Sequence, residues 1–334
     1  MKREEHLFEK IVDPENIRIA FLKAAKGKNG KREVWEFRNQ LEERIIEIRE
    51  KLILGQYPFG QYRFFMIYDP KKRLICAATF GERVVFHAMM NICHANFERY
   101  QIYDSYASRL GKGVYKALER AQFFCRKYMW YLKMDIRKYF DSISHEVLKK
   151  LLLKRFKDKK LINLFDRLIE SYASEEGKGI PIGNLTSQYF ANHYLAVADH
   201  YAKEVLGVKA YIRYMDDIIM YGNNKHVLLK IGRCFEDFCQ KTLCLDFKIF
   251  ALNACCYGLP FLGYIVYGRY LRLSLRSKRR FKNKAILYNE AYENFFWTEE
   301  KCREKINALL AFVRKADSYG YRKSVLYKGV FKGC

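Results

Sequence analysis

The chain has 334 residues, half of them hydrophobic and 16% aromatic, which excludes a disordered chain and allows a large core. Its 62 Lys and Arg residues against 37 Asp and Glu residues give a formal charge of +25. Such a charge favours a polyanionic partner. Nucleic acid is preferred to an acidic membrane, because no stretch reaches the ~18 apolar residues of a spanning helix.

The first ten residues, MKREEHLFEK, lack the apolar run of a signal peptide, so we expect a cytoplasmic protein. Ten cysteines are scattered along the chain. None forms a CxxC pair, and the spacing of Cys234, Cys239 and Cys244 matches no standard zinc pattern. We therefore expect reduced thiols that pack as small apolar side chains.

The first 60 residues carry nearly balanced charges, so the surface for a polyanion is expected elsewhere. Helical spacing of apolar residues predicts helices over 17–26 and 34–54. Residues 62–80, YRFFMIYDPKKRLICAATF, then predict two strands joined at Asp69-Pro70, with three cations at the tip. These cations suit either a solvated turn or phosphate binding. A further helix is expected over 81–97.

An acidic segment follows at 130–142, WYLKMDIRKYFDS. Alternation of apolar and polar residues predicts a strand that ends at Asp135. Asp141 is expected to cap the next helix, together with Ser142 or Ser144, rather than to bind metal.

The stretch Tyr214-Met215-Asp216-Asp217 is flanked on both sides by apolar and β-branched residues. This pattern predicts two short strands with adjacent carboxylates at the turn between them. Carboxylates in such an apolar setting need a compensating charge, and a divalent cation is the usual one. A plain turn is the alternative, although hairpin tips favour Asn-Gly or Asp-Gly and the glycine here comes later. With Asp135, the pair could hold two Mg²⁺ ions for an in-line phosphoryl transfer.

The C-terminal part is predicted to contain a helix over 227–243, a hairpin over 258–266 and further helices from 271 onward, one of them capped by Thr298. Residues 271–334 are strongly basic, unlike the first 60, and this asymmetry favours a nucleic-acid surface over a merely solvated face. Six cations fall on one expected helix: Arg276, Lys278, Arg279, Arg280, Lys282 and Lys284.

Three segments in order, LKMDIRKYFDSISH, GIPIGNLTSQYFAN and YMDD, resemble the motifs of reverse transcriptases, over a region from about Arg63 to Tyr267. Most reverse transcriptases carry Gln-Gly and Ser-Pro in the middle motif. This chain has Ile182-Gly183 and Ser187-Gln188 instead, which resembles the reverse transcriptases of diversity-generating retroelements.

The resemblance implies an α+β right-hand polymerase whose palm holds a split βαβ sheet. It implies the following division: fingers 1–125, palm 126–142, a return segment of the fingers 143–180, palm 181–270 and a helical thumb 271–334.

The resemblance also implies roles for residues around the nucleotide. By position, Lys71 and Arg73 would grip the triphosphate of a dNTP, and Arg109, Lys112 and Lys116 would lie near template or nucleotide. Cations there would neutralise charge on the leaving pyrophosphate.

Phe140 would pack beneath the sugar and exclude a 2′-hydroxyl, or would simply be core. Ile182 stands where relatives carry a Gln that touches the nucleotide, so it would loosen base selection, or would merely pack. Gly183 would let the backbone approach the nucleotide closely. Gln188 belongs to the same site. Lys248 matches the lysine that protonates pyrophosphate, although the usual Asn-x-Lys context is only partly kept.

The implied reaction is attack of a primer 3′-hydroxyl on the α-phosphate of a dNTP, with two Mg²⁺ ions. Asp135 and Asp216 would bridge both ions, Asp217 would assist, and Ile136 is placed with them in the metal site. The resemblance further implies a template-repeat RNA, a cDNA product with errors at adenines, and a small basic oligomeric accessory variability protein.

Two alternatives stay open. One is a retron or group II intron-like reverse transcriptase, disfavoured by Ser187-Gln188 and, for the intron type, by the absence of a maturase region. The other is a basic RNA-binding scaffold, disfavoured by the three intact aspartates.

Overall fold

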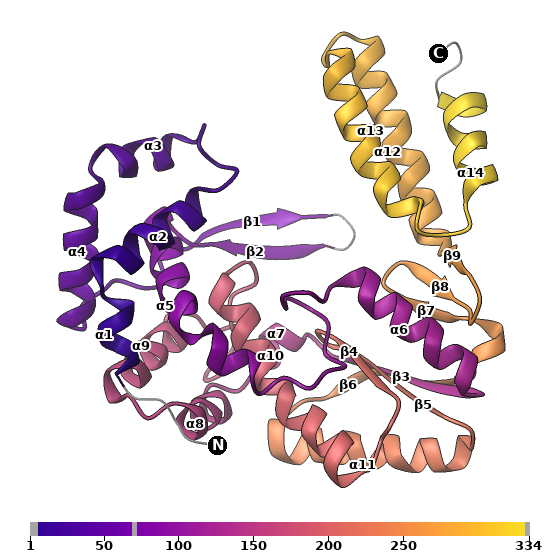
Figure 1. Cartoon of the computed structure of the whole chain (residues 1–334), viewed down its shortest axis with the longest axis horizontal. Coiled ribbons are helices and arrows are strands. Elements are labelled where there is room, and N and C mark those ends of the chain that lie inside the picture. Colours follow the sequence, from indigo (N-terminus) through magenta and orange to yellow (C-terminus); the bar gives the residue numbers. More distant parts are fainter. Residues whose placement is uncertain (1–5, 69–71, 331–334) are drawn as a thin grey trace.

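The computed structural model describes residues 6–68 and 72–330, which form three parts in chain order (Figure 1). An N-terminal group of helices comes first, a region built on a four-stranded sheet comes second, and a set of helices rises from the far end of that region. No helix among the described residues is both long enough and apolar enough to cross a membrane.

The N-terminal helices pack around the longest of them. Their bounds are α1 (Leu7–Ile11), α2 (Pro14–Ala25), α3 (Arg32–Asn39), α4 (Leu41–Ile53) and α5 (Phe80–Glu98). Asp13 caps α2 with Pro14 at the first helical position, and Thr79 with Glu82 forms a capping box at the start of α5. The single helix predicted over 34–54 is wrong in one respect. It is interrupted at Gln40, whose φ of −119° leaves the helical range, directly after the weak helix former Asn39.

The predicted hairpin is confirmed in its described part. Strand β1 (Arg63–Ile67) pairs antiparallel with β2 (Arg73–Ala77), and the two project from the N-terminal helices across the open side of the molecule (Figure 1). The predicted turn at Asp69-Pro70, and Lys71 after it, lie outside the described residues. The Cys76 N–H donates to the Ile182 carbonyl over 2.9 Å, which attaches the hairpin to the central region.

The central sheet has the order β4-β5-β3-β6, and every neighbouring pair is antiparallel. Its strands are β3 (Trp130–Ile136), β4 (Tyr211–Tyr214), β5 (Asp217–Gly222) and β6 (Phe247–Ala254). Helices link β3 to β4, and α11 (Lys225–Leu243) links β5 to β6, so each helical connection skips over one strand. This is the split βαβ arrangement, and it confirms the α+β prediction.

Both sheet faces are buried along much of their length, which explains the near-continuous apolar runs of β3 and β5. Leu132 and Met220 belong to a core shared with the helices between β3 and β4 and with α11. Tyr131 and Ile219 point the other way, into a second core under α6 (Val114–Lys127). The helices between β3 and β4 are α7 (Tyr139–Ser142), α8 (His145–Arg155), α9 (Lys159–Glu170), α10 (Leu185–His200) and the π-helical turn η1 (Tyr201–Val205).

The C-terminal part begins with a 3₁₀ turn, η2 (Cys255–Tyr257), and a small antiparallel sheet of β7 (Leu259–Phe261), β8 (Tyr264–Val266) and β9 (Leu271–Leu273). The hairpin predicted over 258–266 is thereby confirmed. The helices that follow are α12 (Leu275–Glu293), α13 (Glu299–Val313), α14 (Tyr319–Lys323) and the π-helical η3 (Ser324–Val330). Thr298 caps α13 as predicted, accepting from Lys301 N.

No disulfide joins the cysteines of the described residues, and those in the interior, such as Cys76, Cys239 and Cys255, are packed as small apolar side chains.

Candidate active site

The acidic pair lies at a two-residue turn between antiparallel strands, as the sequence predicted. Strand β4 ends at Tyr214 and β5 begins at its register partner Asp217, so Met215 and Asp216 form the connection. Met215 has a φ of +53°, a left-handed conformation that is uncommon for residues other than glycine. Arg213 Nη1 donates to the Met215 carbonyl over 3.3 Å and holds this turn in place.

Asp135 faces Asp217 directly across β3 and β5. Like charges in directly opposed cross-strand positions repel each other. The sheet therefore brings the carboxylates of two distant motifs together, with Asp216 in the adjoining turn. This placement is the one that the motif order led us to expect.

Lys133 is a member of the site that the sequence analysis missed. Its Nζ lies 3.0 Å from Asp217 Oδ2 and 2.8 Å from the Pro260 carbonyl. Lys133 lies two residues before Asp135 on β3, so both side chains emerge from the same sheet face. The strand alternation was the signal that could have identified it.

The second carboxylate oxygen of Asp217, Oδ1, is buried and has no hydrogen-bond partner. Burial raises the pKa of the Asp217 carboxyl to about 6. Lys133 opposes this shift, and the neighbouring Asp135 and Asp216 add to it. The ionised form of Asp217 is thus electrostatically costly, and a bound cation would relieve that cost.

Carboxylate oxygens are the ligands that Mg²⁺ prefers, so the donor set fits that ion in type. Within the described part of the chain, no three Asp, Glu, His or Cys side chains gather closely enough to hold an ion on their own. Mg²⁺ commonly binds through one or two carboxylates and completes its shell with waters and substrate phosphates, which such an arrangement allows. Ile136 lies at a register shift between β3 and β6, directly after Asp135.

A cavity of about 930 Å³ lies between the hairpin, the segment before α10 and the edge of β6. Among its lining residues are Arg73, Ile182 and Lys248, three of the predicted nucleotide-site residues, from three separate segments. Lys72 and Lys138 also line it, so cations outnumber its one acid, Asp141. A cationic cavity of this kind suits a polyphosphate.

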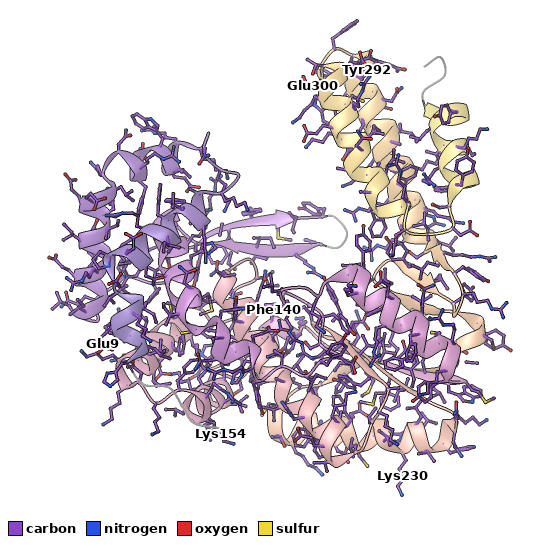
Figure 2. All side chains as sticks on the ribbon, in the orientation of Figure 1. Glu9, Phe140, Lys154, Lys230, Tyr292 and Glu300 are labelled. Atoms are coloured by element: carbon purple, nitrogen blue, oxygen red, sulfur yellow. The ribbon has the colours of Figure 1, made fainter. Side chains whose placement is uncertain are left out.

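Three other predicted residues, Phe140, Gly183 and Gln188, are not among the residues that line this cavity. Phe140 is half-buried against the larger core, near the junction of the N-terminal helices and the sheet (Figure 2). Gln188, on α10, accepts a hydrogen bond from Ser108 Oγ over 2.9 Å.

Gly183 has a structural reason that differs from the predicted one. Its φ is +121°, and an added Cβ would lie 3.0 Å from Ile75 Cγ2 and 3.1 Å from the Cys76 carbonyl. The glycine therefore lets strand β2 of the hairpin pack onto this segment.

The expectation that Arg109 and Lys112 reach template or nucleotide is not supported. The Arg109 guanidinium donates to the Glu98 carboxylate and to the carbonyls of Ile102 and Ser105, so its donors are used inside the protein. Lys112 Nζ lies 3.4 Å from the centre of the Tyr103 ring and donates to the Tyr103 carbonyl.

The predicted cap of the helix after Asp141 is confirmed for Ser144 and wrong for Asp141. Ser144 caps α8 by accepting from Val147 N, because it is the residue directly before the first helical turn. Asp141 lies within α7, and burial raises the pKa of its carboxyl.

A buried ion pair holds β4, the strand that leads into the acidic turn, against α10. Arg213, on β4, donates through Nε and Nη2 to the Asp199 carboxylate of α10, and Tyr211 donates to the same carboxylate over 2.7 Å. Arg213 Nη1 also donates to Asn192 Oδ1 over 3.0 Å. These bonds fix α10 against the strand that leads into the turn.

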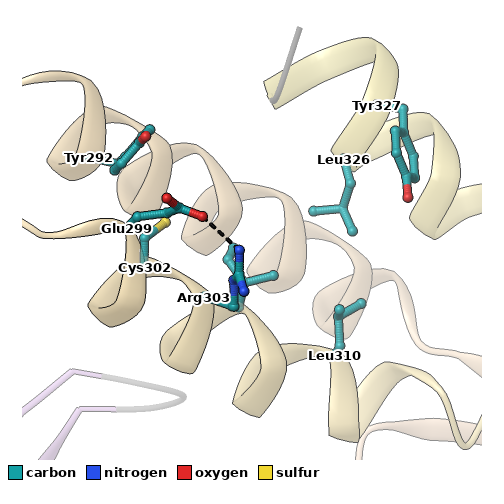
Figure 3. A pocket seen from close by; sticks show the side chains of 8 residues that line it. Tyr292, Glu299, Cys302, Arg303, Leu310, Leu326 and Tyr327 are labelled. Carbon is teal, nitrogen blue, oxygen red and sulfur yellow. Dashed lines mark hydrogen bonds and ion pairs between the residues drawn. The ribbon is translucent and has the colours of Figure 1, made fainter. Parts of the chain in front are cut away.

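A second cavity, of about 410 Å³, lies among the C-terminal helices, and Tyr292, Leu310 and Leu326 are among its lining residues (Figure 3). Its walls come from α12, α13 and η3, and the Glu299–Arg303 ion pair crosses part of it. It contains none of the predicted site residues. The six cations predicted on one helix all lie on α12.

The chain matches the model of one protein family and is similar to several known proteins. The family model for reverse transcriptase (RNA-dependent DNA polymerase) matches residues 69–249, just over half of the chain. A Saccharomyces cerevisiae protein named for intron 1 of COX1/OXI3 is 23% identical over 173 residues, covering 49% of this chain and 21% of that protein. Another, named for intron 2, is 33% identical over 88 residues, covering 23% and 10%. The chain thus spans about a fifth, or less, of the length of these curated relatives.

Among solved structures, telomerase from Candida tropicalis with a TWJ fragment of telomeric RNA is similar at 12% identity and a TM-score of 0.49, covering 84% of this chain and 58% of that one.

Proposed function

Because the chain belongs to the reverse transcriptase (RNA-dependent DNA polymerase) family, we propose that it copies an RNA template into DNA at the acidic turn of its central sheet. The observation that carries the proposal is the placement of Asp135 opposite Asp217, with Asp216 in the adjoining turn. The fold is that of a right-hand polymerase.

We assign its parts as follows: fingers to 1–125 and 143–180, palm to 126–142 and 181–270, and thumb to 271–334. The split βαβ sheet supports the palm assignment, and the α12–α13 pair that rises from its far end supports the thumb (Figure 1).

Asp135 and Asp216 are the residues that would hold two Mg²⁺ ions, with Asp217 assisting and Ile136 beside them. When bound, such ions activate the primer 3′-hydroxyl and neutralise the charge that develops on the leaving oxygens. The orphaned, buried Oδ1 of Asp217 supports a cation at this place.

The protein itself would bind and orient the dNTP. Arg73 and Lys72 in the cavity, and by position Lys71, would hold the triphosphate in line with the primer. Lys248, which lines the same cavity from β6, would donate a proton to the leaving pyrophosphate. Phe140 does not line this cavity, so its exclusion of a 2′-hydroxyl stays a prediction from the resemblance.

The finer function that we propose is that of a diversity-generating retroelement enzyme, which copies a template-repeat RNA with errors at adenines. Its support is Ile182-Gly183 and Ser187-Gln188, together with the position of Ile182 in the wall of the cavity. An isoleucine side chain offers no hydrogen bond, and loss of one such contact changes discrimination by about 1–3 kcal/mol, or roughly ten- to a hundredfold. The basic accessory protein and the cytoplasmic location rest on the sequence arguments alone and stay predictions.

An intron-type reverse transcriptase is the second candidate, because the curated relatives reported above are named for introns. The two candidates differ in accuracy. Copying of a defined RNA, followed by base-by-base sequencing of the cDNA, separates them. Errors concentrated opposite adenines favour the first, and even, infrequent errors favour the second.

The link to Ile182 is tested in the same assay with Ile182→Gln, using the exposed Val205→Gln as the matched control. We expect the adenine error frequency to fall at least about tenfold in Ile182→Gln and to stay unchanged in the control. An unchanged error frequency in Ile182→Gln would remove the proposed role of this side chain.

A further inference from the structure

Lys133 joins two parts of the molecule that are distant in sequence. Its Nζ donates to Asp217 Oδ2 in the acidic turn and to the Pro260 carbonyl in β7. The Lys133 side chain is only 18% exposed and that of Asp217 only 20%, so solvent screens the pair little. The ammonium also lies 5.9 Å from the centre of the Phe261 ring, a second contact with β7.

The strand that Lys133 reaches is itself bonded to the C-terminal helices. Strand β7 pairs with β8 through the turn at Gly263, and the Gly263 carbonyl accepts from Ser277 Oγ at the start of α12 over 2.6 Å. Tyr264 Oη, on β8, donates to the Phe312 carbonyl of α13 over 2.6 Å. A continuous path of polar contacts thus runs from Asp217 through Lys133 to α12 and α13.

We propose that Lys133 is a positioning residue, which sets the Asp217 carboxylate relative to the β7–β8 hairpin and holds one of its oxygens away from a bound metal. This inference rests on the proposed function for its kinetic consequence, but its structural part does not. Because one Asp217 oxygen is bound to Lys133, Asp217 could offer only Oδ1 to a metal ion. Asp135 and Asp216 would then be the main ligands of that ion.

Removal of the Lys133 charge should strengthen the binding of a divalent ion but slow the reaction. In Lys133→Met, both Asp217 oxygens become available and the local negative charge increases, so a divalent ion should bind more tightly. The β7–β8 hairpin also loses its contact with the acidic turn, so the Asp217 carboxylate should be positioned less precisely for the reaction. Misplacement of about 1 Å at a reacting centre costs up to about a hundredfold in rate. A residue that only stabilised the fold would instead weaken both binding and catalysis.

The experiment compares wild type, Lys133→Met and Lys133→Arg, with Lys230→Met as a control on the exposed face of α11 (Figure 2). Mg²⁺ binding is measured by calorimetry without nucleic acid, and hydrogen exchange is followed at residues 259–266. We expect Lys133→Met to bind Mg²⁺ about three- to tenfold more tightly and to exchange faster at residues 259–266 than elsewhere in the described chain. Lys133→Arg should restore both values, and Lys230→Met should match wild type.

The kinetic arm is primer extension over a range of dNTP concentrations up to saturation. We expect kcat to fall about ten- to a hundredfold in Lys133→Met while the dNTP KM stays within about twofold. Adding Asp217→Asn should abolish the Mg²⁺ effect of Lys133→Met, since the two changes act through one contact. Unchanged Mg²⁺ affinity and hairpin exchange in Lys133→Met would overturn the inference. Failure of the wild type to extend a primer would instead count against the proposed function, because the binding and exchange measurements do not depend on it.

Discussion

Arg213 Nη2 lies 2.7 Å from Asp199 Oδ2, and neither side chain is exposed to solvent. The pair joins β4, two residues before the acidic turn begins, to α10, which carries the second part of the middle motif. A buried charge that loses its partner is far more costly than the pair itself, so this contact should control both the stability of the fold and the position of the turn.

Asp199→Asn should therefore destabilise the protein strongly. The substitution leaves the Arg213 charge buried without a counter-charge, and we expect a loss of about 3–5 kcal/mol in the free energy of unfolding, measured by urea denaturation. Asp237→Asn, an exposed acid on α11, is the control and should change it by less than about 0.5 kcal/mol. If Asp199→Asn costs no more than that control, the buried pair does not support the turn.

Arg73→Ala should weaken nucleotide binding without weakening the hold on the primer-template. A charge-assisted contact with phosphate contributes about 1.5–3 kcal/mol, so we expect the dNTP KM to rise at least about tenfold in steady-state extension. Lys230→Ala, on the exposed face of α11, should leave KM unchanged. A rise in the primer-template Kd at constant dNTP KM would place Arg73 on the nucleic acid instead of the triphosphate.

Gly183→Ala should loosen the β1–β2 hairpin from the central region. The new Cβ would need a φ of +121° and would press on the Cys76 carbonyl, so we expect a loss of roughly 1–3 kcal/mol in stability and faster hydrogen exchange in the hairpin. Gly27→Ala is a matched control, since Gly27 also has a positive φ, +72°, but nothing lies near its added Cβ. Equal effects of the two substitutions would show that backbone strain alone, and not the hairpin contact, requires Gly183.

Stability and Mg²⁺ binding should depend on pH through Asp217, whose pKa is raised to about 6 by burial in the folded protein. In the unfolded chain the pKa of Asp is about 3.9, so the folded state binds the proton more tightly. The stabilisation from this proton is present in full below about pH 4 and is lost as pH rises through about 6. An ion that binds the ionised carboxylates should restore stability above that range.

The measurement is the melting temperature with EDTA or with Mg²⁺, at pH 5 and at pH 7.5. Mg²⁺ should raise the melting temperature at pH 7.5 and much less at pH 5, where Asp217 is mostly protonated. Asp135→Ala should remove the response to Mg²⁺. Equal increments at both pH values would contradict a site that contains Asp217.

Those parts of the structure that depend on local sequence pattern were predicted correctly from the sequence. The acidic turn, the strand that ends at Asp135 and the cap at Thr298 each follow from the residues within a few positions. Strand alternation could also have placed Lys133 beside Asp135, although its contact with Pro260 depends on how the small sheet packs.

Contacts between distant segments could not be read from local pattern. Arg213 and Asp199 meet only because α10 packs under β4. Arg109 was expected near template or nucleotide because its segment resembles a motif of the family, but Glu98 and two carbonyls lie within its reach. The contact of Gly183 with the hairpin was not predicted, because Ile75 and Cys76 lie more than a hundred positions earlier in the chain.

The most direct test of the account is primer extension on an RNA template with Mg²⁺ and dNTPs. Wild type, Asp216→Ala and Asp237→Ala are compared, after their melting temperatures have shown that all three proteins are folded. We predict template-directed DNA synthesis by wild type and Asp237→Ala. Asp216→Ala should lose at least about a thousandfold in rate, because its carboxylate would hold ions that supply several kcal/mol of transition-state stabilisation. DNA synthesis by a folded Asp216→Ala protein at the wild-type rate would contradict an active site at the acidic turn.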